Sequence, residues 1–556
     1  MLSSNRLVAG VDYGTDSARV AVWDIDRQKC IASVSSAYSR WSQNMYCVPE
    51  KRQFRQHPLD YIESLEKCFD ALVQKMGREQ CSNIKAISFA TTGSTLCPID
   101  EKGIPLSLYE EFCDEPDAMF ILWKDHSAIE EAAEVNDVFQ KAPIDYTRYQ
   151  GIYSSEWWWA KILYVAKNNP RVIKRTYSWV EQSDWLPNLL LGTDRADNIK
   201  RNACAAGHKA LYSSTWGGLP NSAILEELHP HLKEVSLRYS LPPLVAGENM
   251  GVISKEWAER LNVSTNTIVV AGSLDAHAGG VGAHIKHGRL VKVIGTSTVD
   301  LFLTNYCEIE NNDLRDICGI AENAVIPGYL SGEAGQAAFG DIFRWYVDQF
   351  IWVLNHAAPS ICSEKCQEEL SEYLLNNLLS ILESHIQEDC NSNIIALDWF
   401  NGRRYPIINE EATAAISELT LAATPPQIYH ALVMGAIMGS KLILDNLLKN
   451  GIKVEEVVLV GGIPRKSSLI CQMFADILAL PIVICSEQEI CAKGAAIYAA
   501  VGADYFSSIE KAQESLCLEE FQRYFPSHDS IIAYQKKYEQ YVELARWTDA
   551  KIGKLK

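Results

Sequence analysis

The sequence predicts an α/β protein made of two duplicated domains around a central cleft, and three observations lead to this prediction. The chain has 556 residues, too many for one ordinary hydrophobic core, so two domains of roughly 250 to 300 residues each are expected. A strand–turn–strand pattern near the N-terminus recurs near the middle of the chain. Strand-like and helix-like segments are intermixed in both halves.

The repeated pattern is a pair of apolar strands joined by a turn that contains Gly and Thr. The first copy spans 7–23 and the second spans 290–303. If each hairpin opens one domain, the boundary falls in 283–288. The first domain is then expected to cover residues 1–286 and the second to cover residues 287–556.

Other segments fit the same organisation. Apolar residues at helical spacing predict helices, and short apolar runs predict strands. The predicted strands are 84–89 and 457–460; the predicted helices are 61–76, one with the apolar face Leu469, Ile470, Met473, Phe474, Ile477 and Leu478, polar-faced helices in 361–390, and an amphipathic segment over 509–556.

Composition narrows the classes of partner and compartment. The formal net charge is -19 without a Lys/Arg-rich block, so neither nucleic acid nor an anionic membrane is an expected partner. No charged-then-apolar leader and no apolar stretch of about 18 residues is evident, which predicts a cytoplasmic protein. The 16 cysteines are scattered without a C-x-x-C pair and are expected to be reduced thiols. The assembly state is open, and a homodimer is one option.

The two turns carry the first chemical signal. A Gly-Thr-x-Ser/Thr turn points consecutive backbone N–H groups and hydroxyls into one concavity, which suits phosphate oxygens, although Gly and Thr are also ordinary turn residues. Asp12 directly precedes the first turn, where a carboxylate could hold Mg²⁺ or its waters; a turn-capping Asp is the alternative. Neither a P-loop nor the paired protein-kinase motifs are present in the sequence.

A second acidic signal follows a buried strand in the middle of the chain. The run 268–274 ends in Asp275, and small residues after it begin a helix. A carboxylate there could accept a proton from a sugar hydroxyl during phosphoryl transfer, and the helix N-terminus would keep it ionised. Local sequence alone fits an N-cap Asp equally well.

Paired phosphate turns of this kind resemble those of the actin, hexokinase and Hsp70 superfamily, whose domains are ribonuclease H-like. Within it the chain resembles the FGGY family of carbohydrate kinases, and several strings resemble its ribulokinase branch. The strings are Asp12–Ser17, Phe54–Pro58, Thr92–Thr95, Ala118–His126, Gly151–Trp157, Ala206–Lys209, Val293–Thr298, Glu333–Gln336 and Leu397–Arg404.

The resemblance implies transfer of phosphate from MgATP to the 5-hydroxyl of L-ribulose, which yields L-ribulose 5-phosphate, with Asp275 as the base. Two alternatives stay open: an FGGY kinase of D-ribulose, xylulose or a pentitol such as ribitol, and a non-catalytic nucleotide-binding regulator. The regulator would be expected to lack Asp275, Glu333 or Lys209, and all three are present. Closure of the two domains over the sugar is expected, since water must be rejected as the nucleophile.

Carried over residue by residue, the resemblance also implies the binding sites. The sugar would be bound by Gly93, Ser94, Trp123, Lys209, Asp275 and Glu333, and Mg²⁺ by Asp12 and Asp275 through water. The nucleotide would be bound by Gly14, Thr15, Ser17, Arg19, Gly295, Thr296, Ser297, Gly461, Gly462, Gln472, Asp476 and Gly494.

Without the resemblance, Lys209 and Glu333 fit a surface lysine and a helix-terminal carboxylate better. The chain also departs from the branch at one position. Ala90 stands where an Asp is common in ribulokinases, which puts the sugar preference in doubt.

Overall fold

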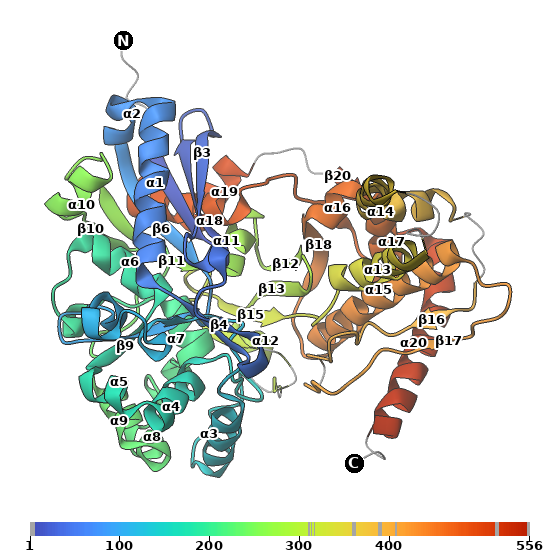
Figure 1. The fold of residues 1–556 in the computed structure, drawn as a ribbon, viewed down its shortest axis with the longest axis horizontal. Coiled ribbons are helices and arrows are strands. Elements are labelled where there is room, and N and C mark those ends of the chain that lie inside the picture. The colour runs from blue at the N-terminus through green and yellow to red at the C-terminus, as the bar shows by residue number, and fades with distance from the viewer. Residues whose placement is uncertain are drawn as a thin grey trace.

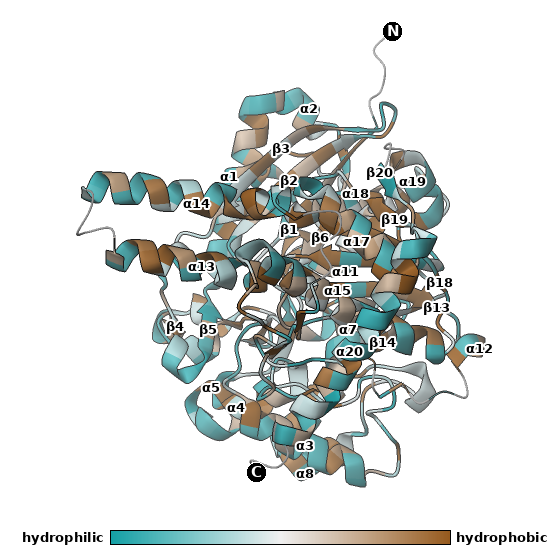
Figure 2. Ribbon diagram, turned by 90° about the vertical axis from the view of Figure 1, so that its right-hand side faces the viewer, coloured by the Kyte–Doolittle hydropathy of each residue, from teal (hydrophilic) through white to brown (hydrophobic). Residues whose placement is uncertain are grey.

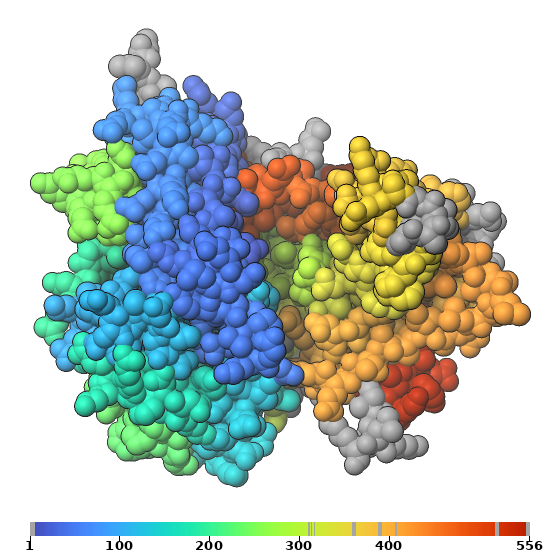
Figure 3. Space-filling model, in the orientation of Figure 1, coloured from blue at the N-terminus to red at the C-terminus, as the bar shows by residue number. Residues whose placement is uncertain are grey.

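Two mixed β-sheets, each covered by helices, form the body of the molecule (Figure 1). The computed structural model describes residues 6–309, 312, 314–315, 317, 319–357, 363–386, 392–405, 408–517 and 522–552. The N-terminal half, blue to green in Figure 1, lies beside the C-terminal half, yellow to red. In Figure 3 the surface is hollowed along the line between the halves, where chain coloured green lies deeper than its neighbours.

The first sheet has six strands in the order β10-β11-β6-β1-β2-β3. β1 is antiparallel to β2 and parallel to β6, and β11 is parallel to β6 on its other side. β1, β6 and β11 are nearly continuous buried runs because both faces of the sheet are covered at its centre. Their bounds are β1 Leu7–Tyr13, β2 Ser17–Asp24, β3 Lys29–Ala37, β6 Ile84–Thr91, β10 Asn249–Val252 and β11 Ile268–Leu274.

The second sheet repeats this plan with seven strands in the order β14-β15-β13-β12-β18-β19-β20. β12 is antiparallel to β13 and parallel to β18, and β18 is parallel to β19, as β1, β2, β6 and β11 are related in the first sheet. The duplication predicted from the two hairpins is therefore confirmed. The bounds are β12 Gly288–Ile294, β13 Thr298–Thr304, β14 Ile320–Glu322, β15 Leu330–Ala334, β18 Val454–Gly461, β19 Ile482–Ile484 and β20 Gln522–Tyr524.

Helices from both halves share the core between the two sheets. α11 (Asp275–Gly282) packs against α18 (Ile490–Gly502), and α18 also packs on β1, β6 and β11 of the first sheet. This core joins residues such as Val8, Ala278, Val291 and Ala496 in one buried cluster. The chain's second half therefore supplies part of the first sheet's cover.

The outer faces of the sheets are covered by further helices. On the first sheet these are α1 Pro58–Met76, α2 Arg78–Ser82, α6 Gln182–Leu191 and α10 Lys255–Arg260. On the second they are α13 Gly340–Ala357, α14 Glu364–Ser384, α15 Pro425–Lys449, α16 Gly462–Lys466, α17 Ser468–Leu478 and α20 His528–Ile552, with α12 Tyr306–Ile309 nearby. α19 Ile509–Leu516 instead packs on α18 and α11, in the core between the two sheets.

A separate hydrophobic core lies in a lobe that is inserted into the first half of the chain. It contains buried Trp158, Trp159 and Trp179 and lies below the first sheet in Figure 1. Its helices are α3 Ile129–Lys141, α4 Trp158–Asn168, α5 Pro170–Arg175, α7 Ala203–Ala210, α8 Ser222–Leu228 and α9 Pro230–Leu237. Its small sheet has β4 Cys47–Val48, β5 Gln53–Gln56, β7 Leu96–Ile99, β8 Phe120–Ile121 and β9 Ser178–Glu181, and β16 Ile395–Ala396 pairs with β17 Ile416–Ser417 in the second half.

Two predictions about the C-terminal half need adjustment. The segment predicted to be helical over 509–556 contains α19 and α20, but β20 lies between them and pairs with β19, so this part of the prediction was wrong. In 361–390 the prediction is met by α14, while 361–362 and 387–390 lie outside the described residues. Figure 2 shows α13 and α14 extending side by side to the edge of the molecule.

One described helix, α15, is long and apolar enough to cross a membrane, with a mean hydropathy of 1.5 over its most apolar window. The expectation that no stretch reaches that length was therefore wrong. Of that window, 72% is buried inside the protein, as is usual for the core helix of a globular domain. Cysteines such as Cys68, Cys97 and Cys471 are thiols outside any disulfide, as expected.

Candidate active site

Two carboxylates lie near one another at the carboxyl ends of β1 and β11, the two strands that flank β6. Asp12 is the next-to-last residue of β1. Asp275 is the first residue of α11, which follows β11 directly. Because β1 and β11 both run parallel to β6, these ends lie at one edge of the sheet. Burial, and after it the negative charge of Asp275, raises the pKa of Asp12 to about 7. Burial likewise raises the pKa of Asp275 to about 6.

Small residues let the helix that begins with Asp275 lie close to α18. A β-carbon on Gly494 would lie 1.8 Å from the carbonyl oxygen of Ala278, so only glycine permits this approach. The predicted nucleotide residue Gly494 thus faces α11 in the structure. Its observed effect is to set the position of the helix that carries the candidate base.

Both predicted phosphate turns have the expected form. Each joins its strands through three residues, and each is closed by a backbone hydrogen bond: Gly14 N–H donates to the Ser17 carbonyl over 3.1 Å and Gly295 N–H to the Ser297 carbonyl over 2.9 Å. The carbonyl of Thr296 accepts from the N–H of Phe339 at 2.7 Å. The second turn is thereby fixed against the start of α13.

The first turn is also held by side chains of the inserted lobe. Trp123 Nε1 donates to Thr15 Oγ1 over 3.0 Å, and Gln56 Nε2 donates to the Thr15 carbonyl over 2.7 Å. Trp123, predicted as a sugar contact, therefore lies beside a predicted phosphate contact. Trp123 is 36% exposed, so part of the residue is accessible to a ligand.

The predicted sugar residues Lys209 and Glu333 form an ion pair of 2.8 Å between Nζ and Oε1. Lys209 comes from α7 and Glu333 from β15, so the pair joins the two halves of the chain. Burial alone would raise the pKa of Glu333, but Lys209, together with His208 and His277, lowers it to about 2. Both groups also act on the pKa of Asp275, which places the ion pair beside the candidate base.

Gly93 and Ser94 lie in the turn between β6 and β7, next to β11. A β-carbon on Gly93 would lie 2.8 Å from Leu274 Cδ1, and Ser94 adopts a left-handed φ of 56°. The Ser94 carbonyl accepts a 2.6 Å hydrogen bond from Lys161 Nζ, which also donates to the Leu122 carbonyl over 2.9 Å. Lys161 therefore ties the Gly93 turn to the residue that precedes Trp123.

Sequence reasoning missed Lys161 and its neighbour Glu181, which accepts from the N–H of Thr95 over 2.9 Å. Burial lowers the pKa of Lys161 and raises that of Glu181. A signal was available, because Lys161 stands between the apolar runs Trp157-Trp158-Trp159-Ala160 and Ile162-Leu163. A lysine in a helix that is buried on all sides needs hydrogen-bond partners in the core.

The predicted adenosine contacts lie at the end of β18. Gly461 pairs in register with Ile294 and has a φ of 129°, so the Gly-Gly pair lies next to the second phosphate turn. A β-carbon on Gly462 would meet no atom within 4 Å, which leaves space beside it. On the first turn's side, Arg19 pairs with Glu489 at 2.9 Å.

Gln472 and Asp476 have other partners in the structure. Gln472 Nε2 donates to the carbonyl of Phe525 over 2.9 Å and to Asp476 Oδ1 over 3.1 Å. Asp476 Oδ1 accepts from the N–H of Ser527 over 2.8 Å. These two residues fasten the segment before α20 to α17, and a contact of either with nucleotide stays a prediction.

We call the edge of the first sheet that carries Asp12 and Asp275 the acidic edge, and Ala90 lies between these two residues. It is fully buried in β6 and pairs with Asp12 on one side and Ser273 on the other. A carboxylate at this position would adjoin Asp12, whose pKa is already raised by burial and by Asp275. Ala90 keeps this edge free of another negative charge.

The acidic edge suits a hard divalent cation. Asp12 Oδ1 is buried and has no hydrogen-bond partner among the described residues. Carboxylate oxygens are the protein ligands that Mg²⁺ takes, usually with waters and substrate phosphates completing the shell. The residues present therefore fit the predicted Mg²⁺ site.

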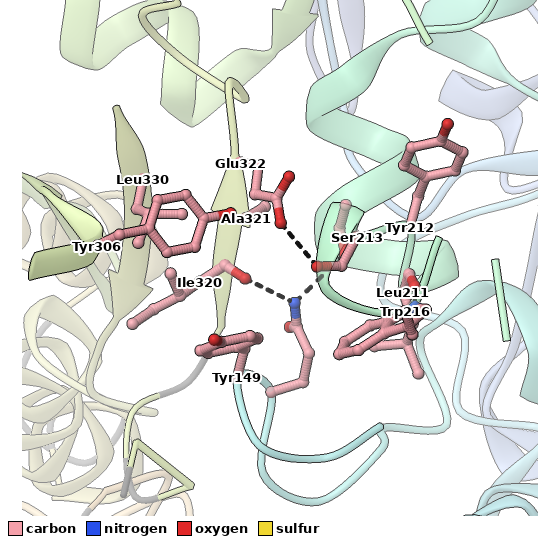
Figure 4. A pocket seen from close by; sticks show the side chains of 12 residues that line it. Tyr149, Leu211, Tyr212, Ser213, Trp216, Tyr306, Ile320, Ala321, Glu322 and Leu330 are labelled. Atoms are coloured by element: carbon pink, nitrogen blue, oxygen red, sulfur yellow. Dashed lines mark hydrogen bonds between the residues drawn. The ribbon is translucent and has the colours of Figure 1, made fainter. Parts of the chain in front are cut away.

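A small pocket lies next to α7, on the side of Gly207 (Figure 4). Its aromatic walls include Tyr149, Tyr306 and Trp216, and its carboxylate, Glu322, accepts a 2.7 Å hydrogen bond from Ser213 Oγ. This hydrogen bond joins the segment that follows α7 to β14.

The structure therefore combines two duplicated domains, a Gly-Thr turn at the start of each, and two buried carboxylates at one edge of the first sheet. The family models for the N-terminal and C-terminal domains of the FGGY family of carbohydrate kinases match residues 7–282 and 290–503. The chain belongs to the FGGY family of carbohydrate kinases.

Curated relatives are similar over nearly the full length. A ribulokinase of Vibrio parahaemolyticus is 36% identical over 542 residues, covering 97% of this chain and 95% of the relative. A ribulokinase of Geobacillus thermodenitrificans is 32% identical over 560 residues, covering 97% and 94%.

Solved structures show the same fold at low identity. A xylulose kinase of Rhodospirillum rubrum matches with a TM-score of 0.78 at 16% identity, covering 98% of this chain and 99% of that one. A gluconate kinase of Lactobacillus acidophilus matches with a TM-score of 0.77 at 18% identity, covering 99% and 100%.

The ion pair between Lys209 and Glu333 gives a stability prediction. Lys209→Met leaves the Glu333 carboxylate in a site where it is only 18% exposed, and removing one partner of a buried pair costs about 3–5 kcal/mol. Chemical denaturation of the variant is expected to show this loss, and Lys209→Met/Glu333→Leu is expected to recover much of it.

The matched control is Lys255→Met, which removes a lysine from an exposed pair with Glu259 at 3.9 Å. A change within about 0.5 kcal/mol is expected there. Equal decreases in the free energy of unfolding of Lys209→Met and Lys255→Met would show that the buried pair contributes no more to stability than the exposed pair.

Proposed function

We propose that this protein transfers the γ-phosphoryl group of MgATP to the 5-hydroxyl of L-ribulose and so forms L-ribulose 5-phosphate, a step of L-arabinose catabolism. Family membership supports the sugar kinase chemistry, and similarity over the whole chain to proteins named ribulokinase supports the substrate. The observation that carries the proposal is the position of Asp275, buried at the acidic edge beside the Lys209–Glu333 ion pair.

In the proposed reaction, the Asp275 carboxylate accepts the proton of the sugar hydroxyl while the hydroxyl oxygen bonds to the γ-phosphorus. The bond from that phosphorus to the β,γ-bridging oxygen breaks, and ADP leaves. With a pKa raised to about 6, Asp275 is ionised at neutral pH and is a stronger base than an ordinary aspartate. Its basicity is therefore matched to the task.

The remaining residues would orient the two substrates. Lys209 and Glu333 offer donors and acceptors to the sugar hydroxyls, Trp123 offers an aromatic wall, and Gly93 and Ser94 line the turn beside Asp275. The turns at Gly14–Ser17 and Gly295–Ser297 would hold phosphate oxygens through their N–H groups. Gly461 and Gly462 would take the adenosine.

Mg²⁺ would be held by Asp12 and Asp275 through its waters, and it would neutralise charge on the phosphates. The proposed domains are 1–286 and 287–556, and the family matches over residues 7–282 and 290–503 lie within them. A cytoplasmic location and a homodimer both remain predictions.

The second candidate is an FGGY kinase that prefers another ketopentose or a pentitol. The specific observation that favours it is Ala90, which removes a carboxylate from the edge that binds the reacting groups. Sugars of this class differ by one or two hydrogen bonds, so a single absent carboxylate can change the preference by about 1–3 kcal/mol.

The test is a coupled ADP-release assay with MgATP against L-ribulose, D-ribulose, L- and D-xylulose, ribitol, L-arabinitol and glycerol. We expect the highest kcat/KM with L-ribulose. A higher value for another sugar would overturn the substrate but keep the kinase. If no sugar stimulates ADP release, the non-catalytic regulator becomes the better account.

A further inference from the structure

Three side chains that the proposed phosphoryl transfer does not use form a buried cluster beside the sugar site. Cys204 and His208 come from α7 and His277 from α11, and one ligand atom from each lies within 4.8 Å of the other two. Their exposed fractions are 1%, 0% and 1%. The combination of one thiol and two imidazoles is a ligand set for a metal ion.

The backbone presents this cluster from rigid elements. Cys204 and His208 are four residues apart on α7 and so lie on one face of that helix. The first turn of α7 is capped by Asn202, whose Oδ1 accepts from the N–H of Cys204 over 2.8 Å. The Asn202 amide also donates to the carbonyl of Gly272 in β11. Because α11 follows β11 directly, the two helices are fixed relative to one another.

The two histidines have unsatisfied polar atoms. All four ring nitrogens of His208 and His277 are buried without a hydrogen-bond partner among the described residues. The rings lie close together, with centroids 4.6 Å apart, but no hydrogen bond joins them. Buried nitrogens without partners are unfavourable, because they lose their hydrogen bonds to water and gain none in return. A bound cation would satisfy one nitrogen of each ring.

Another buried polar atom that has no partner in the described part of the chain lies near His208. Gln150 Nε2 donates to the carbonyls of Gly207 and Ile320, while its Oε1 is buried and without a partner among the described residues. Gln150 Oε1 and His208 Nδ1 lie 2.9 and 3.4 Å from the point that a β-carbon on Gly319 would occupy. Glycine at that position leaves the two atoms space to face one another.

We propose that Cys204, His208 and His277 bind one Zn²⁺-like cation, and that this cation inhibits sugar phosphorylation by acting on Glu333. Thiolate and imidazole ligands select Zn²⁺ and similar ions over Mg²⁺, which prefers oxygen. On binding, the Cys204 thiol releases its proton to solvent and its sulfur donates to the cation. The site is therefore distinct in chemistry from the acidic edge at Asp12 and Asp275.

The route to inhibition runs through His277. Its Nε2 lies 3.7 Å from Glu333 Oε2, while Glu333 Oε1 pairs with Lys209. A cation bound to the imidazole makes its N–H a stronger donor to a nearby carboxylate, as in carboxylate–histidine–zinc arrangements. Glu333 is thereby drawn away from the position proposed for sugar binding. This inhibitory part rests on the proposed function, whereas the binding of the cation does not.

Binding is tested first, without sugar or nucleotide. Chelator-treated full-length protein is dialysed against Co²⁺, which replaces Zn²⁺ and gives a thiolate-to-cobalt charge-transfer band. We expect one equivalent more of bound Co²⁺, and a stronger charge-transfer band, in the wild type than in Cys204→Ser or His208→Gln. Cys113→Ser, which also removes one thiol but an exposed one, is the matched control and should retain both signals. Equal stoichiometry and spectra in wild type and Cys204→Ser would overturn the site.

Inhibition is then measured by adding Zn²⁺ to the kinase assay under saturating MgATP. We expect the KM for the sugar to rise on the order of tenfold in the wild type and in Cys113→Ser, in line with the effect of disturbing a partner of a metal ligand. Cys204→Ser should lose this response. An unchanged KM in a protein that binds Co²⁺ at the cluster would overturn the inhibitory role. An inactive protein that still binds Co²⁺ there would count against the proposed function alone.

Discussion

Asp275→Asn is expected to lower kcat by about 10²- to 10⁴-fold while sugar binding is largely retained. The amide has nearly the shape of the carboxylate but cannot accept the hydroxyl proton. The N–H of Ala276 donates to Asp275 Oδ1 over 2.6 Å, and the asparagine carbonyl can accept this same bond. The variant should therefore keep the fold of the site and lose the base.

Turnover is measured by ADP release and sugar binding by calorimetry without nucleotide. Asp194→Asn, at an exposed position outside the site, is the matched control and should retain wild-type turnover. A loss of less than about tenfold in Asp275→Asn would show that another group accepts the proton. A loss of sugar binding in the variant would instead make Asp275 a binding residue.

Gly494→Ala is expected to have a comparably large effect through packing rather than chemistry. Its added β-carbon would lie 1.8 Å from the carbonyl oxygen of Ala278, a backbone atom that can move only with α11. Overpacking of a core costs about 1–3 kcal/mol, and a forced backbone shift tends to cost more. Because α11 begins with Asp275, we expect both a lower Tm and a reduced kcat.

Gly279→Ala is the matched control, since it lies on α11 and faces the same helix. Its β-carbon would first meet the Cys491 side chain, at 3.3 Å, which can adjust. Alanine also favours the helical conformation over glycine by about 1 kcal/mol. Thermal melts and turnover should therefore change little in Gly279→Ala. Equal effects of the two substitutions would contradict the role of the close approach at Gly494.

Patterns along the chain were sufficient to predict the duplicated fold. The two hairpins could be recognised because apolar strands and a Gly-Thr turn are local features, and the strand of Asp275 was apparent from its buried run. The strand β20 was missed because its three residues carry no apolar alternation and form only by pairing with β19. Edge strands of this kind depend on tertiary contacts.

Parts of the candidate site could not be predicted from the sequence, because they too depend on tertiary contacts. The partner of Lys209 is 124 positions away, and no local pattern links Lys209 to Glu333. The role of Lys161 could not be predicted either, because its hydrogen-bond acceptors are the backbone carbonyls of Ser94 and Leu122. Every residue carries a backbone carbonyl, so the amino-acid sequence does not show which carbonyls accept these hydrogen bonds.

The packing of α18 on β1, β6 and β11 has a consequence for how the chain is made. A ribosome adds about 5–20 residues per second, so roughly tens of seconds pass between synthesis of the first sheet and synthesis of the helix that covers its inner face. During that interval the apolar residues of this face, such as Val8 and Val270, have no native cover. The nascent N-terminal half therefore completes its folding only when the chain is nearly finished.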